Sequence, residues 1–147
     1  MSCVGFFTPQ QLARVRAAAA DPRPVSAFTA PAASASKRRR VAEMAESADS
    51  LVRAAAASTS LASAEVLTRL AADGEIGVRC SVARNPAAPP NLLEGLARDT
   101  DDGVRAWVAA NPTTPPDVLA HLSSDTSALV RDVTRWAARW AAPPGPT

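Results

Sequence analysis

Arginine recurs at a fixed interval through most of this chain of 147 residues. Arg53, Arg79, Arg105 and Arg131 each follow a valine, and successive copies are 26 residues apart. A row of guanidinium groups could line a groove for phosphates or acidic peptides. A structural role is the alternative: an aspartate precedes each of the last three arginines by six residues, so a carboxylate recurs beside every copy. We favour the structural role.

Aspartate keeps the same interval, at Asp73, Asp99 and Asp125. Such a carboxylate row could bind a metal ion or take part in acid–base catalysis. The three residues also fall where helices are expected to start. A carboxylate there accepts backbone N–H bonds and meets the positive end of the helix dipole. The sequence therefore favours structural capping for these aspartates.

Three residues that depart from the repeat are candidate partner contacts: Trp107, His121 and Arg84. Trp107 replaces Ser81 of the preceding repeat and could be an exposed anchor, since tryptophan is enriched in interface hot spots. It could equally pack over an arginine or proline side chain of a neighbouring repeat. The single histidine, His121, is interpreted as a surface residue.

A basic segment precedes an acidic body. Residues 1–40 hold seven basic side chains against one acidic side chain, whereas residues 41–147 hold nine basic and 13 acidic ones. The sharpest part is Lys37-Arg38-Arg39-Arg40, a candidate contact for a polyanion. The alternative is a solvated segment that pairs with nearby acids such as Glu43 and Glu46.

The motifs of common enzymes are missing from the sequence. There is no phosphate-cradling glycine loop, no HExxH or CxxC, and no Ser-His-Asp set around His121. Cys3 and Cys80 are isolated, which favours a reducing cytoplasm and predicts neither metal nor disulfide. We expect a non-enzymatic protein without a cofactor. No apolar run is long enough for a membrane helix, and the arginine-, alanine- and proline-rich composition suggests a bacterial source.

The 26-residue period predicts the elements that position these side chains. A fixed period of this length is the signature of a solenoid, whose repeats bury their apolar faces against their neighbours. Each unit combines a short, proline-started segment, shortened towards a 3₁₀ helix, with a longer α-helix. About four units are expected, and they cover residues 37–57, 63–83, 89–109 and 115–135.

The flanks divide the chain into an arm, a solenoid and a tail. Residues 1–36 are expected to form an arm with one short helix over 8–20 and a Pro/Ala/Ser-rich linker over 21–36. The solenoid covers 37–142. Its last helix lengthens over 129–142, because no Asn-Pro pair stops it there. Residues 143–147 form a frayed tail.

The repeat text VRCSVARNPAAPPNLLEGLARDTDD, and the copy that follows it, resemble the bacterial leucine-rich repeat variant family. The likeness covers about 76–131 clearly and 37–75 more faintly. It implies an all-α, right-handed solenoid of alternating 3₁₀ and α helices whose repeats are interaction surfaces. A member of that family holds an iron–sulfur cluster on an N-terminal cysteine-rich segment. Only Cys3 precedes the repeats here, so we do not expect the cluster.

Three functions follow from these patterns. The first is a binding module that recognises another protein through a solenoid surface around Trp107. The second is a nucleic-acid-binding protein that uses the basic arm and the arginine row on DNA or RNA phosphates. The third is self-association through the ends of the stack, so the chain is expected to be a monomer or to associate weakly.

Overall fold

The computed structural model describes residues 35–141, which form eight α-helices and no strand. The helices alternate between short and long elements, separated by tight turns. In chain order they are α2 Ala35–Met44, α3 Ser50–Ser58, α4 Ala64–Leu70, α5 Ile76–Arg84, α6 Pro90–Leu96, α7 Asp102–Ala110, α8 Pro116–Leu122 and α9 Ala128–Ala141.

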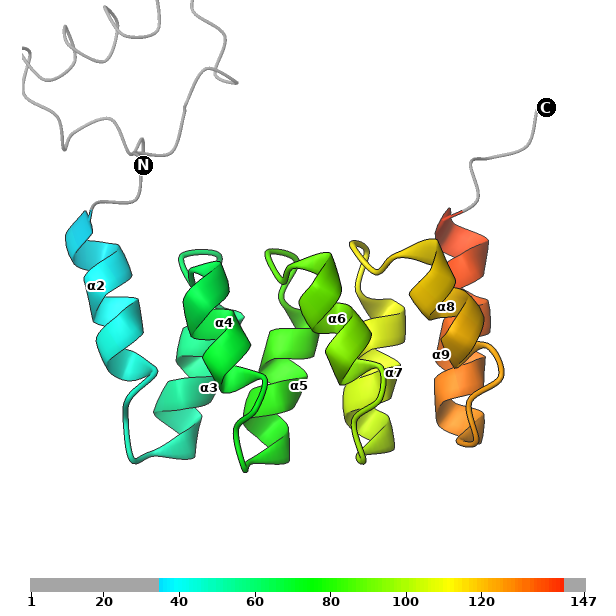
Figure 1. Ribbon diagram of the computed structural model, residues 1–147, viewed down its shortest axis with the longest axis horizontal. Coiled ribbons are helices and arrows are strands. Elements are labelled where there is room, and N and C mark those ends of the chain that lie inside the picture. The colour runs from blue at the N-terminus through cyan, green and yellow to red at the C-terminus, as the bar shows by residue number, and fades with distance from the viewer. Residues whose placement is uncertain (1–34, 142–147) are drawn as a thin grey trace, which may run out of the picture. The chain divides into compact units, whose positions relative to one another are not determined.

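The described helices stack into a two-layered solenoid, which confirms the predicted fold class. The longer helices α3, α5, α7 and α9 each contact the next one of the row. The short helices α4, α6 and α8 form the second layer, in front of the long helices in Figure 1. Each short helix contacts the long helices before and after it. Helix α2 contacts α3 and ends the stack on the N-terminal side.

The short elements are α-helices, which corrects the expectation of 3₁₀-like segments. In α6, for example, the Leu93 N–H bonds to the Pro89 carbonyl at 3.2 Å, and the Ala97 N–H bonds to Leu93 at 2.9 Å. Prolines occupy positions whose N–H groups need no partner within the helix, so they do not shorten its hydrogen-bond pattern. Three-residue spacing appears at the two ends of α6, where the Leu92 N–H bonds to the Pro89 carbonyl at 2.9 Å and the Asp99 N–H bonds to the Leu96 carbonyl at 3.1 Å.

The core lies between the two layers and repeats with the sequence. Each short helix contributes leucines and each long helix contributes valines on one face, as the helical period requires. The largest fully buried side chains are Leu67, Leu70, Leu93, Leu122, Val78, Val82, Val104, Val108 and Val130. Alanines such as Ala57, Ala83 and Ala109 let neighbouring long helices approach closely. Burying each leucine or valine contributes about 1.5–3 kcal/mol.

The ends of the stack differ in part from expectation. Helix α2 begins at Ala35, two residues before the predicted start of the repeats. Helix α9 has 14 residues, which confirms the lengthened last helix. The helix predicted over 8–20, the tail at 143–147 and the side chain of Trp140 fall outside what the structure describes. Within residues 35–141, no helix is both long and apolar enough to cross a membrane.

Candidate functional site

The arginine and aspartate rows meet in ion pairs between consecutive repeats. The Arg53 guanidinium donates to both carboxylate oxygens of Asp73, through Nε at 2.6 Å and Nη2 at 2.9 Å. The same two-bond pairing joins Arg79 to Asp99, at 2.7 and 3.1 Å, and Arg105 to Asp125, at 2.8 and 2.9 Å. Both members are largely buried in every pair. We call this set the ion-pair ladder.

The ladder uses a different aspartate from the one that the sequence spacing suggested. The carboxylate comes from 20 residues later, on the next repeat. The aspartate six residues earlier contributes its backbone instead, since Arg79 Nη1 donates to the carbonyl of Asp73 at 2.9 Å. Arg105 contacts Asp99 in the same way, at 2.8 Å. Each guanidinium thus joins a turn of its own repeat to the next repeat.

The expected capping role also belongs to other residues. Asp73, Asp99 and Asp125 lie in the turn before each long helix and accept the N–H of the residue two positions later. The carboxylate at the helix start is Asp49 for α3 and Asp101 for α7, where Oδ1 accepts the Val104 N–H at 3.1 Å. The ladder aspartates order the turn and pair with arginine, and they do not cap the helices.

Pairing shifts the pKa of the ladder groups away from neutrality. The hydrogen bond from Arg53 lowers the pKa of Asp73, and the bond from Arg105 lowers the pKa of Asp125, in both cases against the effect of burial. Burial has the largest effect on Asp99 and raises its pKa, but bonds from Arg79 and from the Asp101 N–H outweigh it and leave the pKa lowered. The partner arginines have raised pKa values. None of these carboxylates is set up to exchange a proton near pH 7.

A second ladder, which the sequence analysis missed, is made of buried asparagines. The Asn111 amide nitrogen donates to the carbonyls of Ala83 at 2.7 Å and Asn85 at 3.0 Å, both in the preceding repeat. The Asn85 amide does the same to Ala57 and Thr59, at 2.6 and 3.0 Å. Their Oδ1 atoms accept N–H groups of their own turns. The Asn-Pro pair was interpreted only as a helix stop, although its 26-residue recurrence was visible.

The candidate contacts Trp107 and Arg84 lie together on the surface of the long helices. The Arg84 guanidinium carbon lies 5.0 Å from the centre of the Trp107 ring, a cation–π geometry. The indole is still 42% exposed. Beside it an apolar groove of about 260 Å³ lies between α7 and α9, lined by Gly103, Ala106, Trp107, Ala110, Leu129 and Val133. The two sequence alternatives for Trp107 therefore coexist: it packs with an arginine and remains accessible.

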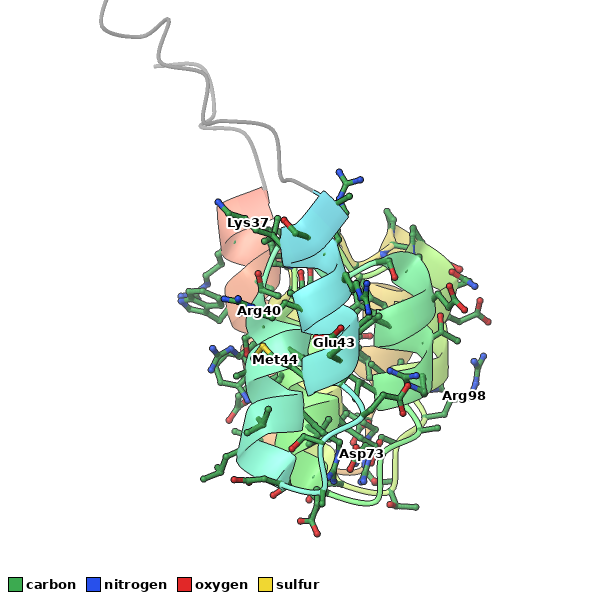
Figure 2. The ribbon with its side chains drawn as sticks, turned by 90° about the vertical axis from the view of Figure 1, so that its left-hand side faces the viewer. Lys37, Arg40, Glu43, Met44, Asp73 and Arg98 are labelled. Carbon is green, nitrogen blue, oxygen red and sulfur yellow. The ribbon has the colours of Figure 1, made fainter. Side chains whose placement is uncertain are left out.

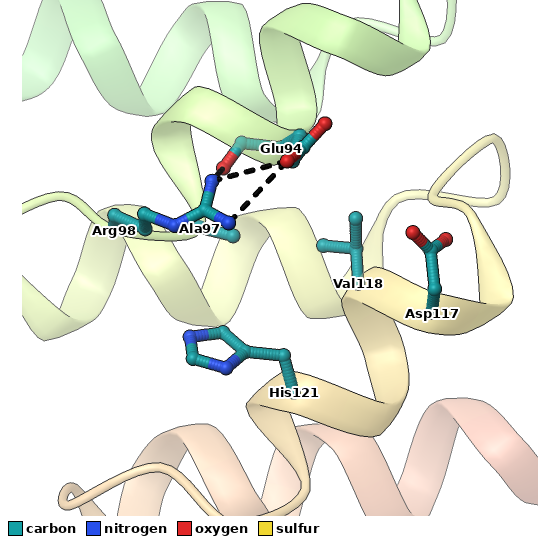
Figure 3. A pocket seen from close by; sticks show the side chains of 6 residues that line it. All are labelled: Glu94, Ala97, Arg98, Asp117, Val118 and His121. Carbon is teal, nitrogen blue, oxygen red and sulfur yellow. Dashed lines mark hydrogen bonds and ion pairs between the residues drawn. The ribbon is translucent and has the colours of Figure 1, made fainter.

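The third candidate contact, His121, lies apart from Trp107, on a short helix of the other layer. It lines a pocket of about 50 Å³ with Glu94, Ala97, Arg98, Asp117 and Val118, from α6, the turn after it and α8 (Figure 3). Arg98, in the turn after α6, is held by Glu94 of that helix. This pocket has room for one or two water molecules and is too small for a metabolite.

The basic segment Lys37-Arg38-Arg39-Arg40 forms part of helix α2. All four cations are exposed. Arg39 pairs with Glu43 at 3.0 Å, while Lys37, Arg38 and Arg40 have no carboxylate partner within residues 35–141. Figure 2, viewed from the α2 end, shows Lys37 and Arg40 on the side of α2 away from Arg98. Successive residues of a helix point in different directions, so the four charges surround α2 rather than line one face.

The part of the chain described contains no group of three or more histidine, cysteine or acidic side chains placed to hold a metal ion. Comparison with known proteins finds the leucine rich repeat variant family in two adjacent copies, at residues 76–101 and 102–127. This match confirms the resemblance for those two repeats. No curated protein and no solved structure matches the chain.

Proposed function

We propose that this chain, whose residues 76–127 are leucine rich repeat variant repeats, is a non-enzymatic module that binds another protein through its long-helix face. This face is the outer surface of α3, α5, α7 and α9. One observation carries the proposal. Every large hydrophobic side chain that is strongly exposed within residues 35–141 lies on these helices: Leu51, Ile76, Trp107, Leu129 and Trp136.

The groove beside Trp107 is the part of this face that we expect to hold a side chain of the partner. It is lined by the small residues Gly103, Ala106 and Ala110 and by the larger side chains of Trp107, Leu129 and Val133. At Gly103 a Cβ atom would lie only 2.9 Å from Asp101 Oδ1, which caps α7, so the position favours glycine and the groove stays open. An apolar side chain of a partner would be enclosed there, and Arg84 restrains the indole before binding. Restraint of this kind lowers the entropic cost of association.

The test is peptide-display selection on the full chain, followed by affinity measurement of the selected peptides. We expect enrichment of peptides with an apolar anchor, and Trp107→Ala should weaken their binding at least about tenfold, since interface tryptophans contribute about 2 kcal/mol or more. His121→Ala on the short-helix layer is the matched control and should change nothing. Binding that survives Trp107→Ala but fails with His121→Ala would place the surface on the other layer and refute the proposal.

Nucleic-acid binding is the second candidate, supported by the exposed cations Lys37, Arg38 and Arg40 of α2, which have no carboxylate partner within residues 35–141. The ion-pair ladder offers it little, because carboxylates occupy three of the four guanidinium groups. Fluorescence anisotropy with labelled DNA and RNA tests it. Phosphate binding should fall steeply between about 50 and 200 mM salt and should be lost when the three cations are replaced by glutamine. Absence of binding at low salt would eliminate this function.

A further inference from the structure

Arg131, the last of the four arginines spaced 26 residues apart, keeps the backbone contacts of the other three. Within residues 35–141 it lacks their carboxylate partner. Arg131 Nη1 donates to the carbonyls of Asp125 at 2.6 Å and Thr126 at 2.9 Å. Arg105 makes the equivalent contacts to Asp99 and Thr100. In Arg105 the remaining edge, Nε and Nη2, holds a carboxylate, whereas no carboxylate of residues 35–141 pairs with Arg131. Its guanidinium is therefore anchored by backbone carbonyls, and no carboxylate of the described residues occupies its Nε and Nη2 edge.

At the opposite end of the ladder, no ladder arginine or aspartate is left without its partner within residues 35–141. Ser47 occupies the position that Asp73 occupies one repeat later, and its hydroxyl keeps the turn by accepting the Asp49 N–H at 3.2 Å. Within residues 35–141 the N-terminal end of the ladder thus leaves no ladder aspartate unpaired, while at the C-terminal end Arg131 has no carboxylate partner. Arg131 is an asymmetric feature of the stack.

The surroundings of Arg131 favour an anionic group. Helix α9 places Arg131, Arg135 and Arg139 four residues apart, on one side of the helix. Its single acid, Asp132, pairs with Arg135. A second copy of the chain is a poor occupant, because stacking head to tail would bring the cationic α2, with Lys37 and Arg40, against this arginine column. An acidic segment of another polypeptide complements it.

We propose that Arg131 binds an aspartate or glutamate side chain of a partner protein, held by Nε and Nη2 as Arg105 holds Asp125. In each of the three pairs of the ladder, Nε and Nη2 of the arginine donate to the two oxygens of one carboxylate. Because the two backbone carbonyls already orient the guanidinium, binding immobilises little further side-chain freedom. The site lies on a different part of α9 from the groove beside Trp107. The two surfaces can therefore be tested separately, and failure of one proposal leaves the other standing.

Arginine side-chain NMR of the full chain tests this site directly. The probe is the capped tripeptide Ser-Asp-Thr, the sequence around Asp125, and the control probe is Ser-Asn-Thr. The Arg131 Nε–H signal, assigned by its loss in Arg131→Gln, should shift towards the Arg105 signal and saturate. The dissociation constant obtained from the Arg131 signal should be at least about tenfold lower than that from the exposed Arg38, which has no carboxylate partner within residues 35–141, because paired hydrogen bonds add to the charge attraction.

Four outcomes would overturn the proposal. The first is an Arg131 shift that saturates no better than that of Arg38, and the second is an equal response to the asparagine peptide. The third is undiminished peptide binding by Arg131→Lys, and the fourth is tighter binding of inorganic phosphate than of the aspartate peptide. The lysine variant keeps the charge but lacks the planar two-donor edge, so it separates specific pairing from general attraction. Preference for phosphate would assign the edge to phosphorylated or nucleic-acid ligands instead.

Discussion

Replacing Asn111 by alanine should remove a large part of the stability of the solenoid. The side chain is 5% exposed, and its amide satisfies the carbonyls of Ala83 and Asn85 at 2.7 and 3.0 Å. Alanine would leave both carbonyls without this donor. An unsatisfied buried polar group costs about 1–3 kcal/mol, so the free energy of unfolding should fall by about 2–5 kcal/mol. A domain of this size has a total of roughly 5–15 kcal/mol.

The assay is urea unfolding of the full chain, followed by circular dichroism and by tryptophan fluorescence. Asn91→Ala is the matched control: it is the same substitution at an exposed position of α6 and should change stability by less than about 0.5 kcal/mol. Asn111→Asp keeps the size but replaces the donor by an acceptor, so it should destabilise at least as much as alanine. The reasoning fails if Asn111→Ala costs no more than Asn91→Ala, or if the aspartate variant is as stable as the natural chain.

Three further predictions concern the ladder and the core. A double-mutant cycle of Arg105→Gln and Asp125→Asn, measured by urea unfolding, should give a coupling of about 1–3 kcal/mol, and a value near zero would remove the ladder's structural role. The ladder aspartates have lowered pKa values, so as the pH falls the unfolded chain binds protons before the folded chain does. The free energy of unfolding should therefore be constant above about pH 5 and decline below about pH 4. The decline should be smaller in Asp125→Asn. Leu93→Ala should cost about 2–5 kcal/mol of unfolding free energy. Trp107→Ala should cost clearly less, and an equal loss would make Trp107 a core residue.

The helices followed from the sequence because their signals are local. The stops at Asn85 and Asn111 and the valines at 26-residue spacing predict a unit over 89–109, and the structure has α6 and α7 over nearly the same residues. The 3₁₀ expectation was wrong because paired prolines affect only the first N–H groups, which have no helical partner in any case.

The contacts between repeats were harder to predict because periodicity treats all repeats alike. Asp99 lies 20 residues after Arg79 and six residues before Arg105, and both intervals recur from repeat to repeat, so the period alone could not choose between the two arginines. The nearest aspartate in sequence was the wrong choice for Arg79. The contact between Trp107 and Arg84 gave no repeat signal, since neither residue recurs at its position in the other repeats.

The short reach of these ladders has a consequence for how the molecule can change its length. The hydrogen bonds of the two ladders join residues at most 28 positions apart, as in the bond from Asn111 to Ala83. A duplicated 26-residue unit would therefore bring its own arginine, aspartate and asparagine to both new junctions. The neighbouring repeats would meet the same partners as before. Insertion of whole repeats thus leaves the contacts at each junction between repeats unchanged. An insertion of any other length between repeats would separate the paired residues of both ladders.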